Sequence, residues 1–430
     1  MGTSDIAITA LAATPTLRGN KLKATVLATG PAANIPNLLL QTVIFYASLT
    51  NDFAAAAEVA RGNPEALDAG LIEERTYYYW ARAIDASGNL GAVYPASPTA
   101  GVACKAIGLS GLAFGLANGR IEASAPAGAL TVSIKTSAGT DPTPDNPVYM
   151  AFPNDSGGIG SYSILSIVAA LSLTLPSGMK IGGGVGQPLR LWLVLFNDDG
   201  VLRLSIKNCS DGARTIFPLL ESGIEAATAA STSANNFGVF YASQAIGAKP
   251  YRIVGYMDWA AGFAVTIGVW TVPDLVRMFS AGMPKPGDSI QDFSQSAQQG
   301  LSTTSLIPYD NTIPQSSEGG ELLAVPFTPK SACNFIEIEV LMSLRHTAIS
   351  AVIAAIFIDS ATDAVVVGWT YVAVANGPAQ MHIRYRLPAA STATRTYRIR
   401  AGAAVAGTLT VNVYMLNTAS PFIRVAELTG

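Results

Sequence analysis

Hydrophobic and polar residues alternate with a period of two over many short runs of the chain. The pattern is clear in "ALTVSIKT" (129–136), "VLRLSIKN" (201–208) and "RTYRIRAG" (395–402), and Gly, Pro, Asn or Asp residues recur between such runs. This period places successive side chains on opposite faces of a β-strand, and the turn residues end each strand. No long stretch shows helical periodicity with caps, and we expect short helices only near 63–71 and 271–279. The sequence therefore predicts an all-β fold.

The clearest predicted hairpin is "LRLWLVLFNDDGVLRLSIKN" (189–208), in which two apolar runs flank "NDDG". Asn, Asp and Gly tolerate the positive φ angles of a tight turn. A glycine-rich stretch, "IGGGVG" at 181–186, lacks the Lys and Ser/Thr of a phosphate-binding loop and the last Gly of a dinucleotide fingerprint. We interpret this stretch as a turn.

Three tyrosines and a tryptophan follow one another in "LIEERTYYYWARAIDASGNLG" (71–91), in a chain with only 8% aromatic residues. Period-two alternation divides this strand into a core face with Tyr77, Tyr79, Ala81 and Ala83, and an outer face with Tyr78, Trp80, Arg82 and Ile84. We therefore expect Tyr78 and Trp80 to be available to a partner.

The length of 430 residues exceeds one ordinary core and predicts roughly two to four domains. The stretch 284–305 is rich in Pro, Ser and Gln and has few core residues, which is typical of a connector. We expect three β-sandwich-like domains in series, formed by residues 1–103, 104–283 and 306–430, with 284–305 as a linker.

The composition limits the classes of partner. Hydrophobic residues make up 50% of the chain and charged residues only 13%, against about 25% charged in an average globular protein. We therefore expect much of the surface to be buried against other subunits. Gly, Pro, Ser, Asn or Gln interrupt the longest uncharged stretches, so we expect no membrane insertion, and the N-terminus has no secretory signal pattern. A net charge of −3 without a basic cluster argues against nucleic acid.

The residues that most often carry catalysis or bind metals are few and dispersed. Cys104, Cys209 and Cys333 lie far apart and have no metal-binding spacing, so we interpret them as small buried residues. Neither His346 nor His382 lies in a metal or nucleophile motif, and each is expected to be a packed or surface histidine. The sequence also lacks the nucleophile-elbow and zinc-protease motifs.

The positions of the carboxylates indicate turns more than a catalytic or metal-binding site. Asp198 and Asp199 lie in the predicted hairpin turn, Glu73 and Glu74 in the corner before the tyrosine row, and Glu318, Glu321, Asp359 and Asp363 are scattered. Asp310 and Asn311, with Glu318 and Glu321, offer oxygen ligands for Ca²⁺ or Mg²⁺, but their spacing is not that of an EF-hand. We favour turn chemistry there and leave a metal ion as the alternative. We expect no catalytic residue, no cofactor and no resident metal.

Residues 1–103 resemble a fibronectin type III module. The match rests on Leu71, six residues before Tyr77, on the alternation after that tyrosine, and on "RAIDASGN". The resemblance implies that Tyr77 is a buried corner tyrosine whose hydroxyl bonds back to the chain. Leu71 and Tyr77 are therefore predicted to be structural residues.

The rest of the chain resembles β domains of bacteriophage tail fibres. In the second unit the match lies in "LSLTLPSG", "RLWLVLFNDDGVLRLSIKNC", "PYRIVGYMDW" and "GVWTVPDLV". In the third it lies in "IPYDNTIPQSSEGGELLAVPFTPKSACNFIEIEV", "AAIFIDSATDAV", "YRIRAGAA" and "RVAELTG". The sequence departs from the family's Gly-rich ending near "VYMLNTASPFIRV".

This resemblance implies a structural component of a virion, a tail fibre assembled in the host cytoplasm. It implies a homotrimer, attachment to tail, baseplate or capsid proteins through residues 1–103, and binding of a host-cell surface glycan or protein by residues 306–430. The resemblance does not indicate which residues bind the receptor. A head-decoration or baseplate protein is one alternative. A bacterial surface adhesin is another, and the missing secretion signal disfavours it.

Overall fold

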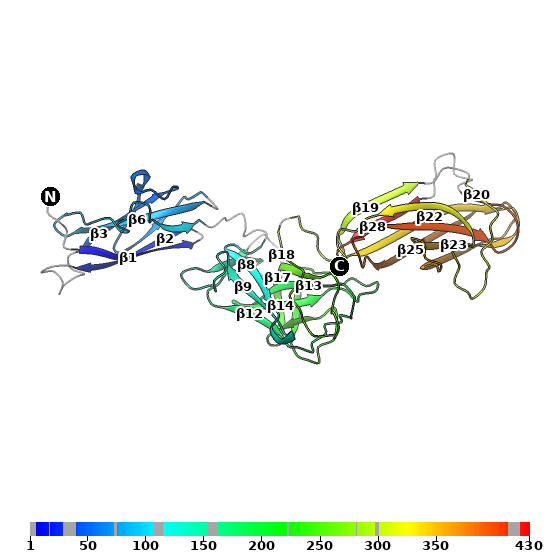
Figure 1. The fold of residues 1–430 in the computed structure, drawn as a ribbon, viewed down its shortest axis with the longest axis horizontal. Coiled ribbons are helices and arrows are strands. Elements are labelled where there is room, and N and C mark those ends of the chain that lie inside the picture. The colour runs from blue at the N-terminus through cyan, green and yellow to red at the C-terminus, as the bar shows by residue number, and fades with distance from the viewer. Residues whose placement is uncertain are drawn as a thin grey trace.

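The computed structural model describes residues 6–16, 18–28, 40–72, 75–106, 115–153, 162–221, 223–280, 282–296, 301–411 and 422–430. These residues form β-strands joined by turns and short 3-10 segments, with no α-helix among them. The predicted all-β class is therefore confirmed. No helix in these ranges is long and apolar enough to cross a bilayer. Figure 1 shows the strands in three groups that follow one another along the longest axis of the molecule.

The first group is a two-sheet sandwich. Its strands are β1 (Ile6–Thr16), β2 (Gly19–Ala28), β3 (Leu40–Ser48), β4 (Ala57–Gly62), β5 (Glu65–Asp68), β6 (Thr76–Asp85) and β7 (Val102–Lys105). One sheet has the order β1-β2-β5 and the other β4-β3-β6-β7. The core between them contains Leu22, Phe45 and Tyr79, each fully buried.

The tyrosine row forms β6, and its inner face agrees with the predicted alternation: Tyr79, Ala81 and Ala83 are buried. The prediction that Trp80 faces a partner is wrong, because this side chain is also fully buried. The 3-10 turn η2 (Phe53–Ala55) places the Phe53 ring 5.7 Å from the Trp80 ring, and a Cβ at Gly101 would lie only 2.6 Å from it. These two segments cover the outer face of β6.

The hydroxyl groups of Tyr77 and Tyr79 have different surroundings. Tyr77 is half-buried and its Oη accepts a hydrogen bond from the Ile72 N–H at 3.0 Å. Leu71 is also half-buried. The structural role of Leu71 and Tyr77 stays a prediction. Tyr79, by contrast, accepts from Asn20 Nδ2 at 2.9 Å and donates to Asp68 Oδ2 at 2.8 Å, so it joins both sheets.

The second group contains eleven strands in the described residues. They are β8 (Gly119–Ser124), β9 (Leu130–Thr136), β10 (Val148–Pro153), β11 (Tyr162–Ile167), β12 (Leu171–Leu175), β13 (Leu189–Asp198), β14 (Val201–Asn208), β15 (Ile224–Ala229), β16 (Phe240–Ala242), β17 (Ile246–Trp259) and β18 (Leu275–Met278). β13 pairs with both β14 and β17, which closes β13-β14-β16-β15-β17 into a ring. The domain 104–283 was predicted to be sandwich-like, but these five strands form a closed, barrel-like sheet.

The closed ring explains the apolar run in β13. Leu191, Leu193 and Leu195 pack in the larger core with the β8–β12 strands, whereas Trp192 and Phe196 pack in a separate core. A strand buried on both faces needs apolar residues at every position, in contrast to a half-buried strand.

The predicted hairpin is confirmed. β13 and β14 pair from Leu191↔Asn208 to Asp198↔Val201, and the turn residues Asp199 and Gly200 have φ angles of 53° and 91°. Two successive positive φ values are those of a type I′ turn.

The two short helices predicted near 63–71 and 271–279 are wrong. The first segment contains β5, which pairs with β2, and the second contains β18, which pairs with β17. Isolated helices of this length are unstable in water, whereas a short strand at a sheet edge gains its hydrogen bonds from the neighbouring strand.

The third group is a second sandwich. Its strands are β19 (Ser289–Ser296), β20 (Ser302–Thr303), β21 (Gly320–Phe327), β22 (Phe335–His346), β23 (Ser350–Ile358), β24 (Val366–Val372), β25 (Ala379–Pro388), β26 (Arg395–Ala403), β27 (Leu409–Val411) and β28 (Phe422–Leu428). One sheet has the order β19-β28-β22-β27-β20, with β25 also paired to β22, and the other has the order β21-β26-β23-β24. The stretch "VYMLNTASPFIRV", where the sequence departs from the family, lies outside the described residues up to position 421.

The prediction that 284–305 is a linker between two domains is wrong. Within it, β19 pairs with β28 from Ser289↔Leu428 to Ser296↔Phe422, and β20 pairs with β27. An edge strand is held by main-chain hydrogen bonds and does not need apolar side chains on both faces, so its polar composition was misleading. The segment belongs to the third group.

Candidate functional site

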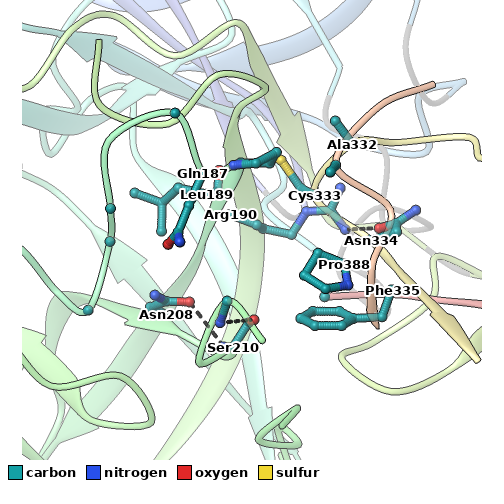
Figure 2. Close-up of a pocket in the computed structure, with 18 residues that line it drawn as sticks. Gln187, Leu189, Arg190, Asn208, Ser210, Ala332, Cys333, Asn334, Phe335 and Pro388 are labelled. Carbon is teal, nitrogen blue, oxygen red and sulfur yellow. Dashed lines mark hydrogen bonds between the residues drawn. The ribbon is translucent and has the colours of Figure 1, made fainter. Parts of the chain in front are cut away.

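A buried ionic network joins the second group to the third, near the start of β13. Arg190 is 5% exposed, and its Nε and Nη2 donate to the two carboxylate oxygens of Asp258 on β17, each at 2.7 Å. Its Nη1 donates to Asn334 Oδ1 of the third group at 2.9 Å, as Figure 2 shows. The guanidinium carbon lies 4.3 Å from the centre of the Tyr256 ring. Burial disfavours the charged form, but Asp258 outweighs it and raises the pKa of Arg190.

Asn334 continues the network into the third group. Its Nδ2 donates to Glu427 Oε1 at 2.6 Å. Glu427 on β28 is fully buried, and it also accepts from the Lys330 and Ser331 N–H groups and from Gln291 Nε2. One amide therefore bridges a buried arginine and a buried carboxylate from different groups.

Further contacts connect the second and third groups around this network, and we call the whole contact region the joint. Trp192 Nε1 donates to the Gly430 main-chain oxygen at 2.8 Å, and Arg214 Nη2 donates to Tyr385 Oη at 3.0 Å. Residues 181–186, the predicted turn, form a loop at this place. Together with 332–335 the loop lines a pocket of about 170 Å³ (Figure 2). Drug-sized ligand sites have about 300–1,000 Å³, so this pocket suits a structural joint better than a ligand.

A larger groove of about 600 Å³ lies on the third group. Residues 308–314 form one wall, residues 364–367 with Trp369 form the other, and Ile353 also lines it. The outward residues of the edge strand β24 are Val367, Trp369 and Tyr371, which are 41%, 57% and 55% exposed. The intervening Gly368 faces the other sheet, where a Cβ would lie 2.6 Å from Ile383. This close approach of β24 to the neighbouring sheet leaves the alternate side chains pointing outward.

Two aromatic rings meet in the groove. The Tyr309 and Trp369 ring centres are 5.1 Å apart at an interplanar angle of 61°, so the rings form a corner. Tyr309 is 55% exposed, although large exposed aromatic groups are uncommon on a protein surface without a partner. The alternation of "AVVVGWTYVAV" placed Trp369 and Tyr371 on one strand face, which was the available sequence signal.

The polar wall of the groove is preorganised. Thr312 donates to Asp310 Oδ1 from its hydroxyl at 2.6 Å and from its N–H at 2.8 Å. These bonds lower the pKa of Asp310, with the hydroxyl bond as the main cause. Among the described residues, Asp310 Oδ2 has no hydrogen-bond partner. Asp310 therefore presents an ionised carboxylate in a defined orientation.

The 308–314 wall is anchored on both sides. The Ile307 N–H donates to the Ala403 carbonyl at 3.2 Å, and the Ala364 N–H donates to the Pro314 carbonyl at 3.1 Å. Gln315 Nε2 donates to the Ile313 carbonyl and to Asp363 Oδ1. These bonds hold the loop against the sheet, so the groove exists before any ligand binds.

The carboxylates considered as alternative metal ligands do not come together as a metal site among the described residues. Glu318 accepts from the Gln315 N–H, Glu321 pairs with Arg398, and Asp359 pairs with Arg395. Within the described ranges no group of three or more His, Cys, Asp or Glu side chains could hold a metal ion. Glu318 thus stabilises a turn and Glu321 a cross-strand pair.

The remaining candidates are separate from the groove. Cys104, Cys209 and Cys333 are free and buried, as predicted. His346 is buried, with Nδ1 2.9 Å from the Ala348 carbonyl, and His382 lies on the surface, 3.0 Å from Glu339. In the hairpin turn, Asp198 pairs with Arg203 and Asp199 with Lys249. Glu73 and Glu74 lie outside the described residues.

The outer face of the β19-β28-β22 sheet carries paired charges. Glu337 on β22 accepts from Arg384 at 2.8 Å and from Arg386 at 2.7 Å. Arg424 on β28 pairs with Asp292 on β19. Burial opposes the ionised form of Glu337, but the two arginines outweigh burial and hold its pKa below the usual value. A face whose charges neutralise each other in this way is suited to solvent.

This network predicts an acid-dependent stability. At neutral pH we expect Glu337→Gln to lower the free energy of unfolding by about 1–2 kcal/mol, because the amide has one acceptor oxygen in place of two and no negative charge to pair with Arg384 and Arg386. The folded-state pKa is depressed, so the stabilisation is present above the ordinary value of 4.5 and is lost as the pH falls through the lower folded value. Urea unfolding across this range should show the two proteins converging. Glu58→Gln, at an exposed pair with Arg61, is the control and should change stability less. A difference independent of pH would contradict the prediction.

Comparison with known proteins identifies no family for this chain. No family model matches the sequence, and no match is found among curated proteins. Among solved structures, the enzymatically active domain of bacteriophage CBA120 tailspike protein 4 is 11% identical over 28% of this chain, with a TM-score of 0.16. A structure of infectious bursal disease virus, Gx strain, is 10% identical over 73% of this chain and 77% of its own, with a TM-score of 0.21.

An α-L-rhamnosidase from Dictyoglumus thermophilum is 8% identical over 99% of this chain and 49% of its own, with a TM-score of 0.24. The chain spans only 18% of the tailspike domain. Similarities at these TM-scores establish neither a common fold nor a common function.

Proposed function

We propose that the chain is a structural component of a bacteriophage virion, a tail fibre whose third group of strands binds the host-cell surface. The resemblance of the second and third groups to phage fibre domains, given in the sequence motifs above, supports this proposal. So does the serial all-β architecture. The observation that carries it is the anchored groove with exposed Tyr309 and Trp369 on the last group. The proposed activity is binding, without turnover of the bound molecule.

The first group, in this proposal, attaches to tail, baseplate or capsid proteins. Its three-plus-four arrangement of strands supports the fibronectin type III-like interpretation. The burial of Trp80 removes one expected contact residue, so attachment uses other parts of the surface. In this proposal the first group attaches to the virion, and the groove lies on the third group, away from that attachment.

A homotrimer is part of the proposal. The second group exposes apolar side chains in the segment between β17 and β18, with Val265 84% and Val272 59% exposed. With only 13% charged residues in the chain, such surfaces favour contact with other copies. Three weak sites on one fibre increase avidity by about 10²–10⁴-fold when they bind together.

Competition for adsorption tests the proposal. A fragment of residues 115–430 keeps the buried joint intact, and at saturating concentration it should slow adsorption of the intact phage. A fragment of residues 1–106 is the control and should leave adsorption unchanged. Both fragments are first checked for folding by circular dichroism. Inhibition by 1–106 alone, or by neither folded fragment, would contradict the proposal and favour a head-decoration or baseplate role.

A further inference from the structure

The groove differs from the rest of the exposed surface because it combines an aromatic corner with an oriented polar wall. Trp369 supplies an apolar ring surface from one wall, and the other wall supplies the Tyr309 ring together with Asp310, Asn311 and Thr312. We propose that this groove binds a neutral saccharide. The inference deepens the proposed function and rests on it, since it assigns a ligand class to the site that meets the host.

The ring surfaces match one side of a sugar. A pyranose has faces of C–H groups and an equator of hydroxyl groups, so it requires apolar and hydrogen-bonding partners at the same time. Trp369, at 57% exposure, provides the larger apolar platform, and Tyr309 meets it at 61°. Aromatic side chains combine large contact area with little loss of conformational entropy.

The polar wall matches the hydroxyl groups. Asp310 Oδ2, which no described residue contacts, can accept two hydroxyl hydrogen bonds, and the Asn311 side chain can both donate and accept. Thr312 holds the Asp310 carboxylate through two hydrogen bonds. Because both walls are held in place by the bonds of Ile307 and Ala364, binding costs little ordering of the loop.

Charge selects among saccharides. Asp310 is the one ionisable acid of the groove lining, and the lining has no Lys, Arg or His. An acidic sugar would therefore meet a carboxylate with no compensating cation. The lining favours a neutral saccharide and disfavours uronic acids and phosphorylated sugars.

The volume of about 600 Å³ also favours a small ligand over a second copy of the chain. It lies within the range of about 300–1,000 Å³ that is usual for ligand sites. A protein partner would need about 800 Å² on each side and would also cover Tyr371, the next outward residue of β24, which does not line the groove. A substitution at Tyr371 therefore distinguishes a protein partner, which would contact this residue, from a small ligand, which would not.

Tryptophan fluorescence gives a direct readout. The chain has five tryptophans, of which Trp80, Trp192, Trp259 and Trp270 are at most 3% exposed, so only Trp369 is open to solvent. Iodide should quench the Trp369 emission, and a saccharide in the groove should protect it. Trp369→Phe should remove the quenchable component.

The test uses the full chain on an array of neutral and acidic bacterial surface saccharides, followed by titration of each binder in the iodide assay. We expect at least one neutral saccharide to bind and to protect Trp369. Trp369→Ala should weaken binding about tenfold or more. Tyr371→Ala, of similar exposure on the same strand face, should leave binding unchanged. Asp310→Asn should reduce the preference for neutral over acidic saccharides.

Two results overturn the inference. One is the absence of any saccharide binding that depends on Trp369. The other is an oligomer that both Trp369→Ala and Tyr371→Ala dissociate, measured by light scattering, because that result assigns the β24 face to another copy. If adsorption is still blocked by residues 115–430 in either case, the proposed function survives and only the ligand class is wrong. If saccharide binding is found but 115–430 does not compete, the proposed function fails instead.

Discussion

Replacing Arg190 by Met lowers the free energy of unfolding by about 3–5 kcal/mol, because it leaves the buried Asp258 carboxylate without its cation. Asp258 is 5% exposed and receives two hydrogen bonds from Arg190. The variant also removes the donor that reaches Asn334. The expected measurement is guanidinium unfolding of residues 115–430, followed by intrinsic fluorescence, since Trp192 and Trp259 lie beside the joint.

Two controls make this prediction specific. Lys249→Met breaks a pair with Asp199, whose side chain is 83% exposed, and should cost less than about 1 kcal/mol. The double replacement of Arg190 by Met and Asp258 by Leu removes both buried charges and should recover much of the loss. If Arg190→Met and Lys249→Met cost the same, the joint network does not hold the two groups together.

Tyr79→Phe should destabilise the first group by about 2–3 kcal/mol at neutral pH. The hydroxyl donates to Asp68 and accepts from Asn20, and both partners are buried. Removing it leaves a buried carboxylate and a buried amide unpaired, each at a cost of about 1–3 kcal/mol. Tyr77→Phe is the matched control and should cost about 1 kcal/mol or less, because its bond with Ile72 is exposed.

The effect of Tyr79→Phe should depend on pH. Burial raises the pKa of Asp68, and the hydrogen bond from Tyr79 partly offsets this. Without the hydroxyl, the ionised carboxylate is less favourable in the folded state, so the penalty is complete above the raised folded pKa. It should shrink as the pH falls through the raised folded pKa values of the variant and the parent protein, because below both values the Asp68 carboxyl is protonated in both folded proteins. Equal urea midpoints for the two variants would contradict the inter-sheet role of Tyr79.

The candidate sites were predictable only in part. The stretch 308–321 drew attention in the sequence because Asp310, Asn311, Glu318 and Glu321 offered oxygen ligands as an alternative to turn chemistry, and its first half, 308–314, forms one wall of the groove. The partner wall, with Trp369, lies more than 50 residues later in the chain, and no local pattern links the two. The joint was not predicted at all. Arg190, Asp258, Asn334 and Glu427 are far apart in sequence and meet only because the start of β13 and the ends of β17 and β28 lie at the same place.

What the sequence determined by itself is local. Period-two alternation and turn residues determined the all-β class, and "NDDG" determined the hairpin at Asp199 and Gly200, because the positive φ angles there depend on those residues alone. The tertiary structure decided which faces are buried and which strands pair. Trp80 is covered by a turn that precedes it by some 25 residues, β19 joins a strand from the far end of the chain, and β13 closes a ring with β17. These outcomes depend on contacts between distant segments, and a local pattern carries no information about which segment will cover a given face.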